Sequence, residues 1–106
     1  MPATNRLTID ATLATRDALR HTPAGVPALS MTLSHASEQP EAGGRRRVEC
    51  EIAAVAFGSI AESIARIPAG SVLRCEGFIA RRYRTGTTLA LHIASFEFEP
   101  GNAKEN

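Results

Sequence analysis

The stretch VAFGSIAESIARIPAGSVLRCEGFIARRYRTG, residues 55–86, decides the fold class of this chain. In order, it contains the end of an apolar strand, a short helix, a Pro/Gly turn, a second strand, and a basic hairpin that holds the only tyrosine of the sequence. A single short helix between strands, followed by an arginine-rich loop, indicates a small closed β-barrel. The rest of the chain is therefore expected to supply the other strands.

Five segments alternate apolar and polar residues with the period of two that predicts half-buried strands. They cover residues 7–13, 29–34, 48–54, 73–79 and 89–93. After the last one the apolar phase slips by one residue, which predicts a bulge near Ala94. Gly77, inside an alternating segment, predicts a bulge or a sharp bend at a barrel corner. Residues 16–26 and 35–45 are expected to be loops, the second of them long and flexible.

The helix of the opening stretch has marked ends. Ser59 is a favourable N-cap, and Glu62 three residues later predicts a capping box. Three isoleucines share one helical face, namely Ile60, Ile64 and Ile67. Three strands, a helix and two strands predict an all-β, five-stranded Greek-key OB-fold barrel with one short helix between strands 3 and 4. A plain β-sandwich is the alternative, but it does not ordinarily place a capped helix at this point.

The length of 106 residues indicates a single domain. We expect residues 1–99 to form this domain and residues 100–106 to be a polar, disordered tail. No apolar run approaches the ~20 residues that are needed to span a bilayer. The N-terminus has no apolar signal region, so the sequence predicts a cytoplasmic protein without membrane contact.

The sequence contains no motif for catalysis or for a cofactor. Its three histidines, His21, His35 and His92, do not have the spacing of metal ligands. It has no phosphate-binding loop, no Gly-x-Ser-x-Gly and no Gly-x-Gly-x-x-Gly. Cys50 and Cys75 each lie in an alternating apolar run, which favours two reduced core cysteines. We therefore expect no enzyme activity, no metal and no cofactor.

Arginine is concentrated in a few short segments, although the formal net charge is only +1. Loops of OB-fold barrels bind oligonucleotides. Guanidinium groups bind phosphates, and a tyrosine ring stacks on a base. The candidate DNA contacts are Arg16 and Arg20 in the first loop, Arg45, Arg46 and Arg47 at the start of the third strand, and Arg81, Arg82, Tyr83 and Arg84 in the basic hairpin. The alternative for each is a solvated surface residue.

Several short segments together carry a family resemblance. They are Asn5-Arg6-Leu7, Pro23-Ala24-Gly25-Val26-Pro27, Glu41-Ala42-Gly43, Cys50 and Gly77-Phe78-Ile79. In this order and spacing they resemble the bacterial primosomal replication protein N (PriB) family, from Asn5 to about Glu99. Residues 55–77 also look like single-stranded DNA-binding protein. Members of that second family normally continue into a long glycine-rich linker and an acidic tip, so the sequence favours the first family.

The resemblance implies a homodimer that binds single-stranded DNA and contacts the restart helicase and other restart proteins. It matches basic residues near Arg20 and Arg46. Likeness to single-stranded DNA-binding protein implies that Phe57 stacks on a base; the alternative is packing at the helix entrance as part of a hydrophobic staple. The family often has tryptophan where Glu49 lies and phenylalanine where Gly44 lies, so those two stacking roles do not carry over.

We therefore expect a non-enzymatic adaptor of the replication-restart primosome, associated with the nucleoid in the cytoplasm. It is expected to bind single-stranded DNA mostly by electrostatics, through its arginine-rich loops, and to recruit or stimulate the helicase. Two alternatives remain. A protein–protein scaffold with weak DNA binding is favoured by Glu49 and Glu51, which point outward by parity. A tail-less single-stranded DNA-binding protein that forms tetramers is the other.

Overall fold

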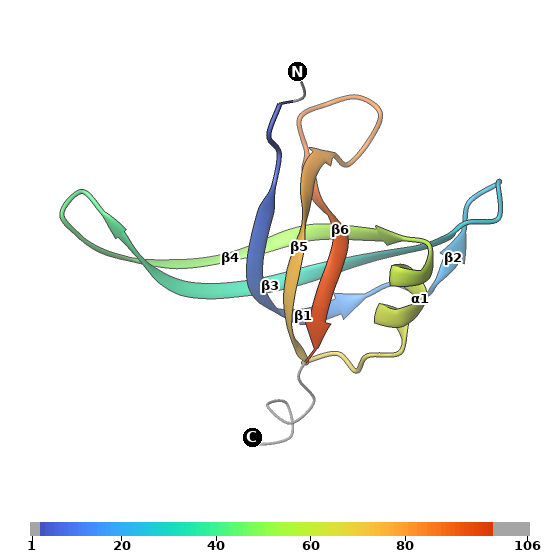
Figure 1. Ribbon diagram of the computed structural model, residues 1–106, viewed down its shortest axis with the longest axis horizontal. Coiled ribbons are helices and arrows are strands. Elements are labelled where there is room, and N and C mark those ends of the chain that lie inside the picture. Colours follow the sequence, from blue (N-terminus) through green and yellow to red (C-terminus); the bar gives the residue numbers. More distant parts are fainter. Residues whose placement is uncertain (1–2, 99–106) are drawn as a thin grey trace.

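The structure, a computed structural model, describes residues 3–98 and shows a barrel from which a long two-stranded arm extends (Figure 1). The elements in chain order are β1 (Leu7–Arg16), β2 (Arg20–His21), β3 (Pro27–Glu41), β4 (Gly44–Phe57), α1 (Ser59–Ala65), β5 (Val72–Arg81) and β6 (Leu89–Phe98). The domain boundary expected at residue 99 and the tail expected at residues 100–106 lie outside the described residues. Within residues 3–98, no helix combines the length and the apolar character that a membrane span requires.

Five strands close the barrel. β1 pairs with β5, β5 with β6, and β3 with both β4 and β1, all antiparallel, while β6 and β4 pair in parallel over a short stretch. β2 adds only two residues beside the start of β3. α1 follows β4, which is the third barrel strand, and buries Ala61 and Ile64. The predicted all-β, five-stranded barrel with one short helix after its third strand is confirmed.

The core contains the inward residues of all five barrel strands, together with one face of α1. Its members with no exposed surface include Leu13, Leu29, Leu33, Leu73, Leu91 and Ile64. Burial of this apolar surface, at roughly 25 cal/mol per Å², is the main stabilising contribution. Of the three isoleucines expected on one helical face, Ile64 is buried and Ile60 packs against the core, as predicted. Ile67 is also buried but lies after the end of α1 at Ala65.

The predicted irregularities at Gly77 and Ala94 are one β-bulge between β5 and β6. Glu76 pairs with Ser95 and Gly77 pairs with Ile93, so Ala94 is the extra residue. A Cβ added at Gly77 would lie 1.8 Å from a carbonyl oxygen of β6. The two backbones approach this closely because residue 77 has no side chain. Both predictions are therefore confirmed, with a shared physical cause.

Residues 35–45 are the largest difference from expectation, because they form strand rather than a long flexible loop. β3 and β4 pair without interruption up to Glu41 and Gly44. The turn between them places Ala42 and Gly43 at positive φ, 51° and 81°. We call residues 35–51 the arm. Both of its faces lie in solvent over most of its length, so residues 35–45 lack the apolar alternation by which strands are predicted.

The expected loop at residues 16–26 is also shorter than predicted. β1 continues through Arg16, and Arg20–His21 form β2 against the start of β3. The turn that remains is closed by hydrogen bonds between Thr22 and Val26, in which the amide N of Thr22 lies 2.9 Å from the carbonyl O of Val26. A strand of two residues is too short to show any periodicity, which explains why the sequence did not predict it.

The predicted capping box at the start of α1 is wrong. The N-cap is Gly58, with φ 77° and ψ −146°, and no side chain caps the helix. Ser59 is the first helical residue, so it does not occupy the position from which its hydroxyl caps. The amide of Gly58 donates to the carbonyl of Pro27 at 2.9 Å. The helix therefore begins after Gly58, whose positive φ is a conformation that residues with a side chain rarely adopt.

The two cysteines lie in different environments, although both were expected in the core. Cys75 is fully buried, whereas Cys50 is exposed. Cys50 has the parity of the inward residues of β4, but it lies on the arm, where no second layer covers the strands. Burial raises the pKa of the Cys75 thiol to about 11, and the charge of Asp10 adds to this effect. The expectation is thus wrong for Cys50.

A thiol reagent such as DTNB is expected to modify the exposed Cys50 rapidly in the folded protein and the buried Cys75 only after unfolding. The thiolate is the reactive form, and burial disfavours it at Cys75. The Cys50→Ser variant should lose the rapid reaction, and Cys75→Ser should retain it. Absorbance of the released thiolate measures both. Two rapidly reacting thiols in the folded parent protein are the result that contradicts this assignment.

Candidate nucleic-acid interface

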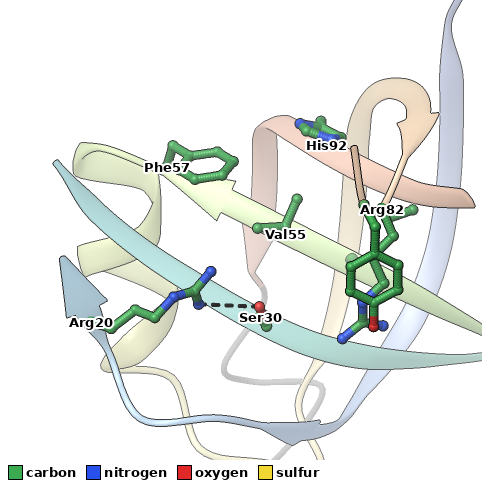
Figure 2. Close-up of a pocket in the computed structure, with 9 residues that line it drawn as sticks. Arg20, Ser30, Val55, Phe57, Arg82 and His92 are labelled. Carbon is green, nitrogen blue, oxygen red and sulfur yellow. Dashed lines mark hydrogen bonds between the residues drawn. The ribbon is translucent and has the colours of Figure 1, made fainter. Parts of the chain in front are cut away.

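A basic groove of about 250 Å³ opens on the outer surface of the barrel, between β2 and the loop that joins β5 to β6 (Figure 2). The residues that line it come from four strands, β2, β3, β4 and β6, and from this loop, and they are Arg20, Ser30, Ala54, Val55, Phe57, Arg82, Tyr83, Ala90 and His92. The lining contains two arginines, three rings and no carboxylate. This composition suits a ligand that is both anionic and aromatic.

The two arginines lie on opposite sides of the groove. Arg20, on β2, donates a hydrogen bond from Nη1 to Oγ of Ser30 at 3.2 Å (Figure 2). Arg82 follows β5, and its guanidinium carbon lies 5.5 Å from the ring centroid of Tyr83. Within residues 3–98, neither arginine forms an ion pair. Both positive charges are therefore available to an anionic ligand.

The aromatic side of the groove is formed by Phe57 and His92. Phe57 is the last residue of β4 and is 43% exposed. Its ring centroid lies 6.0 Å from that of His92, with an interplanar angle of 31°. Tyr83, in the loop after β5, is 61% exposed. Large rings with this much free surface are available for stacking.

Four of the residues predicted as DNA contacts are brought together here. Arg20, Phe57, Arg82 and Tyr83 are far apart in the sequence but line the same groove. Arg81 and Arg84 belong to the same loop region and are exposed, but neither lines the groove. Arg81 ends β5 and pairs with Leu89.

Arg16 lies apart from this cluster and has a structural partner. It is half-buried, and its guanidinium donates a hydrogen bond to the carbonyl oxygen of Ile67, just after α1. It lines a separate depression with Asp17 and Ala69. Arg16 thus connects the end of β1 to the segment that follows the helix.

The arginines predicted at the start of the third strand lie on the arm, away from the groove (Figure 1). Each has an acidic partner: Arg45 with Glu38 at 3.2 Å, Arg46 with Glu41 at 3.5 Å, and Arg47 with Glu49 at 2.7 Å. The arm carries three arginines and four glutamates, a balance of −1. Its positive charge is therefore compensated locally, unlike that of the groove.

Two residues of this surface were not predicted from the sequence. His92 lines the groove, and Phe78 stacks on it with a centroid distance of 5.0 Å and an interplanar angle of 16°. Phe78 is 42% exposed. The alternation of the sequence contained a signal for both residues. His92 lies between the buried Leu91 and Ile93, and Phe78 follows the buried Gly77, so both side chains have the parity of the outer face. Only the pairing of β5 with β6 shows that the two rings meet.

The arrangement suits binding better than catalysis. Within residues 3–98, no cluster of three or more His, Cys, Asp or Glu side chains is placed to hold a metal ion. The groove offers two guanidinium groups for phosphates and exposed rings for bases.

Comparison with known proteins identifies relatives over most of the chain. Residues 5–95 match the protein family described as "Another single-strand binding protein family". Replication restart protein PriB of Bordetella pertussis is 43% identical over 89 residues, which cover 84% of this chain and 83% of that protein. The PriB protein of Nitrosomonas europaea is 42% identical over 89 residues, covering 84% and 82%.

Solved structures show the same architecture. PriB from Ralstonia solanacearum superposes with a TM-score of 0.84 at 42% identity, covering 91% of this chain and 98% of that chain. A Plasmodium falciparum SSB, solved in complex with single-stranded DNA, has a TM-score of 0.77 at 10% identity and covers 93% of this chain and 97% of its own. At that identity the second likeness concerns the fold alone.

Proposed function

The chain belongs to the replication restart protein PriB family of single-strand binding proteins, and from this premise we propose that it binds single-stranded DNA through the basic groove as an adaptor in replication restart. The observation that carries the proposal is the convergence of Arg20, Phe57, Arg82 and Tyr83 on one groove without a carboxylate. In OB folds, this face and these loops bind oligonucleotides.

In this mechanism, arginines bind the phosphates electrostatically and aromatic rings stack on the bases. Arg20 and Arg82 bind phosphates on the two sides of the groove, and Arg81 and Arg84 extend the positive field beyond it. Phe57 and Tyr83 stack on bases, which tolerates any sequence because every base has a π-face. Phosphate contacts carry no sequence information. The adaptor therefore binds single strands of any sequence and performs no chemistry on them.

Binding is expected to depend strongly on salt. The double variant Arg20→Ala/Arg82→Ala removes two phosphate contacts, so the slope of log K against log salt should become shallower by about 1.4, at about 0.7 per phosphate. This corresponds to about 25-fold weaker binding at 0.1 M salt, relative to equal binding at 1 M. Fluorescence anisotropy of labelled oligo-dT measures both quantities.

The matched control removes two arginines from the arm. Arg45→Ala/Arg46→Ala changes the net charge equally, but these guanidinium groups already have glutamate partners. We therefore propose that Arg45, Arg46 and Arg47 contribute less, and that this control changes the slope by less than the groove variant. Equal changes in both variants contradict a groove-centred site. If the affinity of the parent protein for oligo-dT does not change with salt concentration, the electrostatic mechanism is contradicted.

We propose that the protein acts as a homodimer that recruits or stimulates the restart helicase at the nucleoid, in the cytoplasm. The name of the relatives supports the role in replication restart; the helicase is the partner that the family resemblance implies. The dimer is supported by an open strand edge: residues 7–11 of β1 pair with β5 only, since pairing with β3 begins at Thr12. On the side of β1 that faces away from β5, Nδ1 of His35 lies 2.7 Å from the carbonyl oxygen of Asp10. Sedimentation equilibrium distinguishes this dimer from the tetramer of a tail-less single-stranded DNA-binding protein.

A protein–protein scaffold is the second candidate. The observation that favours it is the acidic surface of the arm, where Glu49 and Glu51 are exposed on β4. Carboxylates repel phosphate, so DNA does not favour this face. The salt titration of the parent protein separates the two functions, because a scaffold without DNA binding shows no saturable anisotropy change at low salt.

A further inference from the structure

A row of three rings crosses the outer surface of the barrel from the groove toward β5. We call Phe57, His92 and Phe78 the aromatic row; they come from β4, β6 and β5. The ring centroids are 6.0 Å apart between Phe57 and His92, and 5.0 Å apart between His92 and Phe78. The two phenylalanines are 43% and 42% exposed. The row thus forms a continuous aromatic strip that begins inside the groove and ends outside it.

The strand pairing explains why these rings form a row. His92 lies opposite Val55 in β4 and opposite Phe78 in β5. Gly77 lets the two backbones approach closely, and the extra residue at the bulge follows His92 by two positions. The nearly parallel rings of Phe78 and His92, at 16°, are a consequence of this close approach. The row is therefore held by the sheet and not by a mobile loop.

The charges around the groove favour one exit for a nucleic-acid strand. Toward the arm, the strand meets Glu49, which pairs with Arg47, and the exposed Glu51. The arm as a whole has one more carboxylate than arginines. Toward β5, the outward residues include Arg82 and Phe78. The next carboxylate in that direction, Glu76, forms an ion pair with Arg6. A polyanion with flat bases is attracted by the second exit and repelled by the first.

We propose that single-stranded nucleic acid leaves the basic groove across β6 onto β5, with a base stacked on Phe78, and does not run along the arm. This inference rests on the proposed function and extends the site beyond the groove. Phe78 is then a binding residue, and His92 is the ring that joins the two parts of the path. Stacking makes the extension independent of base identity.

A tryptophan reporter tests the path directly, because the chain contains no tryptophan. In Phe78→Trp, stacking of a base is expected to quench the new fluorescence as oligo-dT is added, with saturation at the concentration found by anisotropy. The matched control is Val72→Trp, on the same strand and the same face, with 44% exposure of the native side chain against 42%. Its fluorescence should not change. Equal responses of the two reporters overturn the proposal.

Affinity provides the second measurement. Phe78→Ala is expected to weaken binding of long oligo-dT about fivefold or more, as for the loss of one base stack, and to leave binding of the shortest oligomer that fills the groove unchanged. If the parent binds and Phe57→Ala weakens binding, but Phe78→Ala does not, the proposed function stands and this path is wrong. If the parent does not bind, the proposed function itself fails. A change in sedimentation mass for Phe78→Ala assigns this ring to a contact between copies and overturns the proposal.

Discussion

Replacing Gly77 by alanine is expected to destabilise the barrel by about 3 kcal/mol or more, at or above the upper end of the usual cost of overpacking. The added Cβ would lie 1.8 Å from the carbonyl oxygen of His92, 2.8 Å from its carbonyl carbon and 3.1 Å from Cα of Ile93. All three are backbone atoms, so no side-chain rotation relieves the clash. β5 and β6 must separate at the bulge.

Urea denaturation followed by circular dichroism measures this effect, with Gly44→Ala as the matched control. Gly44 is also a strand glycine without positive φ, but the nearest atom to its added Cβ is 3.9 Å away. That variant should be neutral or more stable by about 0.4–1 kcal/mol, because alanine restricts the unfolded chain. Equal midpoints for the two variants contradict the assigned role of Gly77.

Phe57→Ala is expected to weaken binding of single-stranded DNA by roughly 5- to 150-fold, the range that corresponds to the loss of one stacked base. The reason is that Phe57 lines the groove, contacts His92 and exposes 43% of its surface. The salt slope should remain nearly unchanged, because stacking releases few counterions. Anisotropy titrations of labelled oligo-dT at several salt concentrations measure both.

Two further substitutions separate stacking from packing at this position. Phe57→Tyr keeps a ring and should bind like the parent protein. Phe57→Leu keeps an apolar side chain at the helix entrance and should bind about as weakly as Phe57→Ala. If Phe57→Leu binds like the parent, the hydrophobic staple is the role of this residue and stacking is not. Urea midpoints of the three variants show that the fold is retained.

Much of the barrel follows from the sequence. Alternation located all five barrel strands, because each has one face in the core and one in solvent. The phase slip predicted a bulge near Ala94 and the glycine predicted a bulge or sharp bend at position 77, and the structure shows that both belong to one bulge. Gly58, by contrast, replaced the predicted serine cap, because the conformation of the turn after β4 outweighed the capping preference of Ser59.

The candidate site was predictable only in part. Arg20, Arg82 and Tyr83 were identified from loop position and chemistry, and the structure places them together. His92 and Phe78 were missed because each is an unremarkable outward residue of its own strand. Their contact depends on the register of β5 against β6, which no local pattern specifies. Residues 35–45 of the arm were not predicted as strand, because strands that are solvated on both faces lack an apolar period in the sequence.

Local sequence patterns are sufficient to predict which residues face the core, where the barrel bends, and which loops carry positive charge. These are local properties, set by side-chain hydrophobicity, by glycine and by the position of arginine along the chain. Which of these charges remain available to a ligand depends on the tertiary structure. It pairs Arg45 and Arg46 with glutamates across the arm and Arg47 with Glu49 on the same strand. Within residues 3–98 it leaves Arg20 and Arg82 beside exposed rings without an ion pair. The ion pairs of the arm depend on the register of β3 against β4. The meeting of Arg20, Arg82 and the rings depends on distances between segments far apart in the sequence, which closure of the barrel establishes.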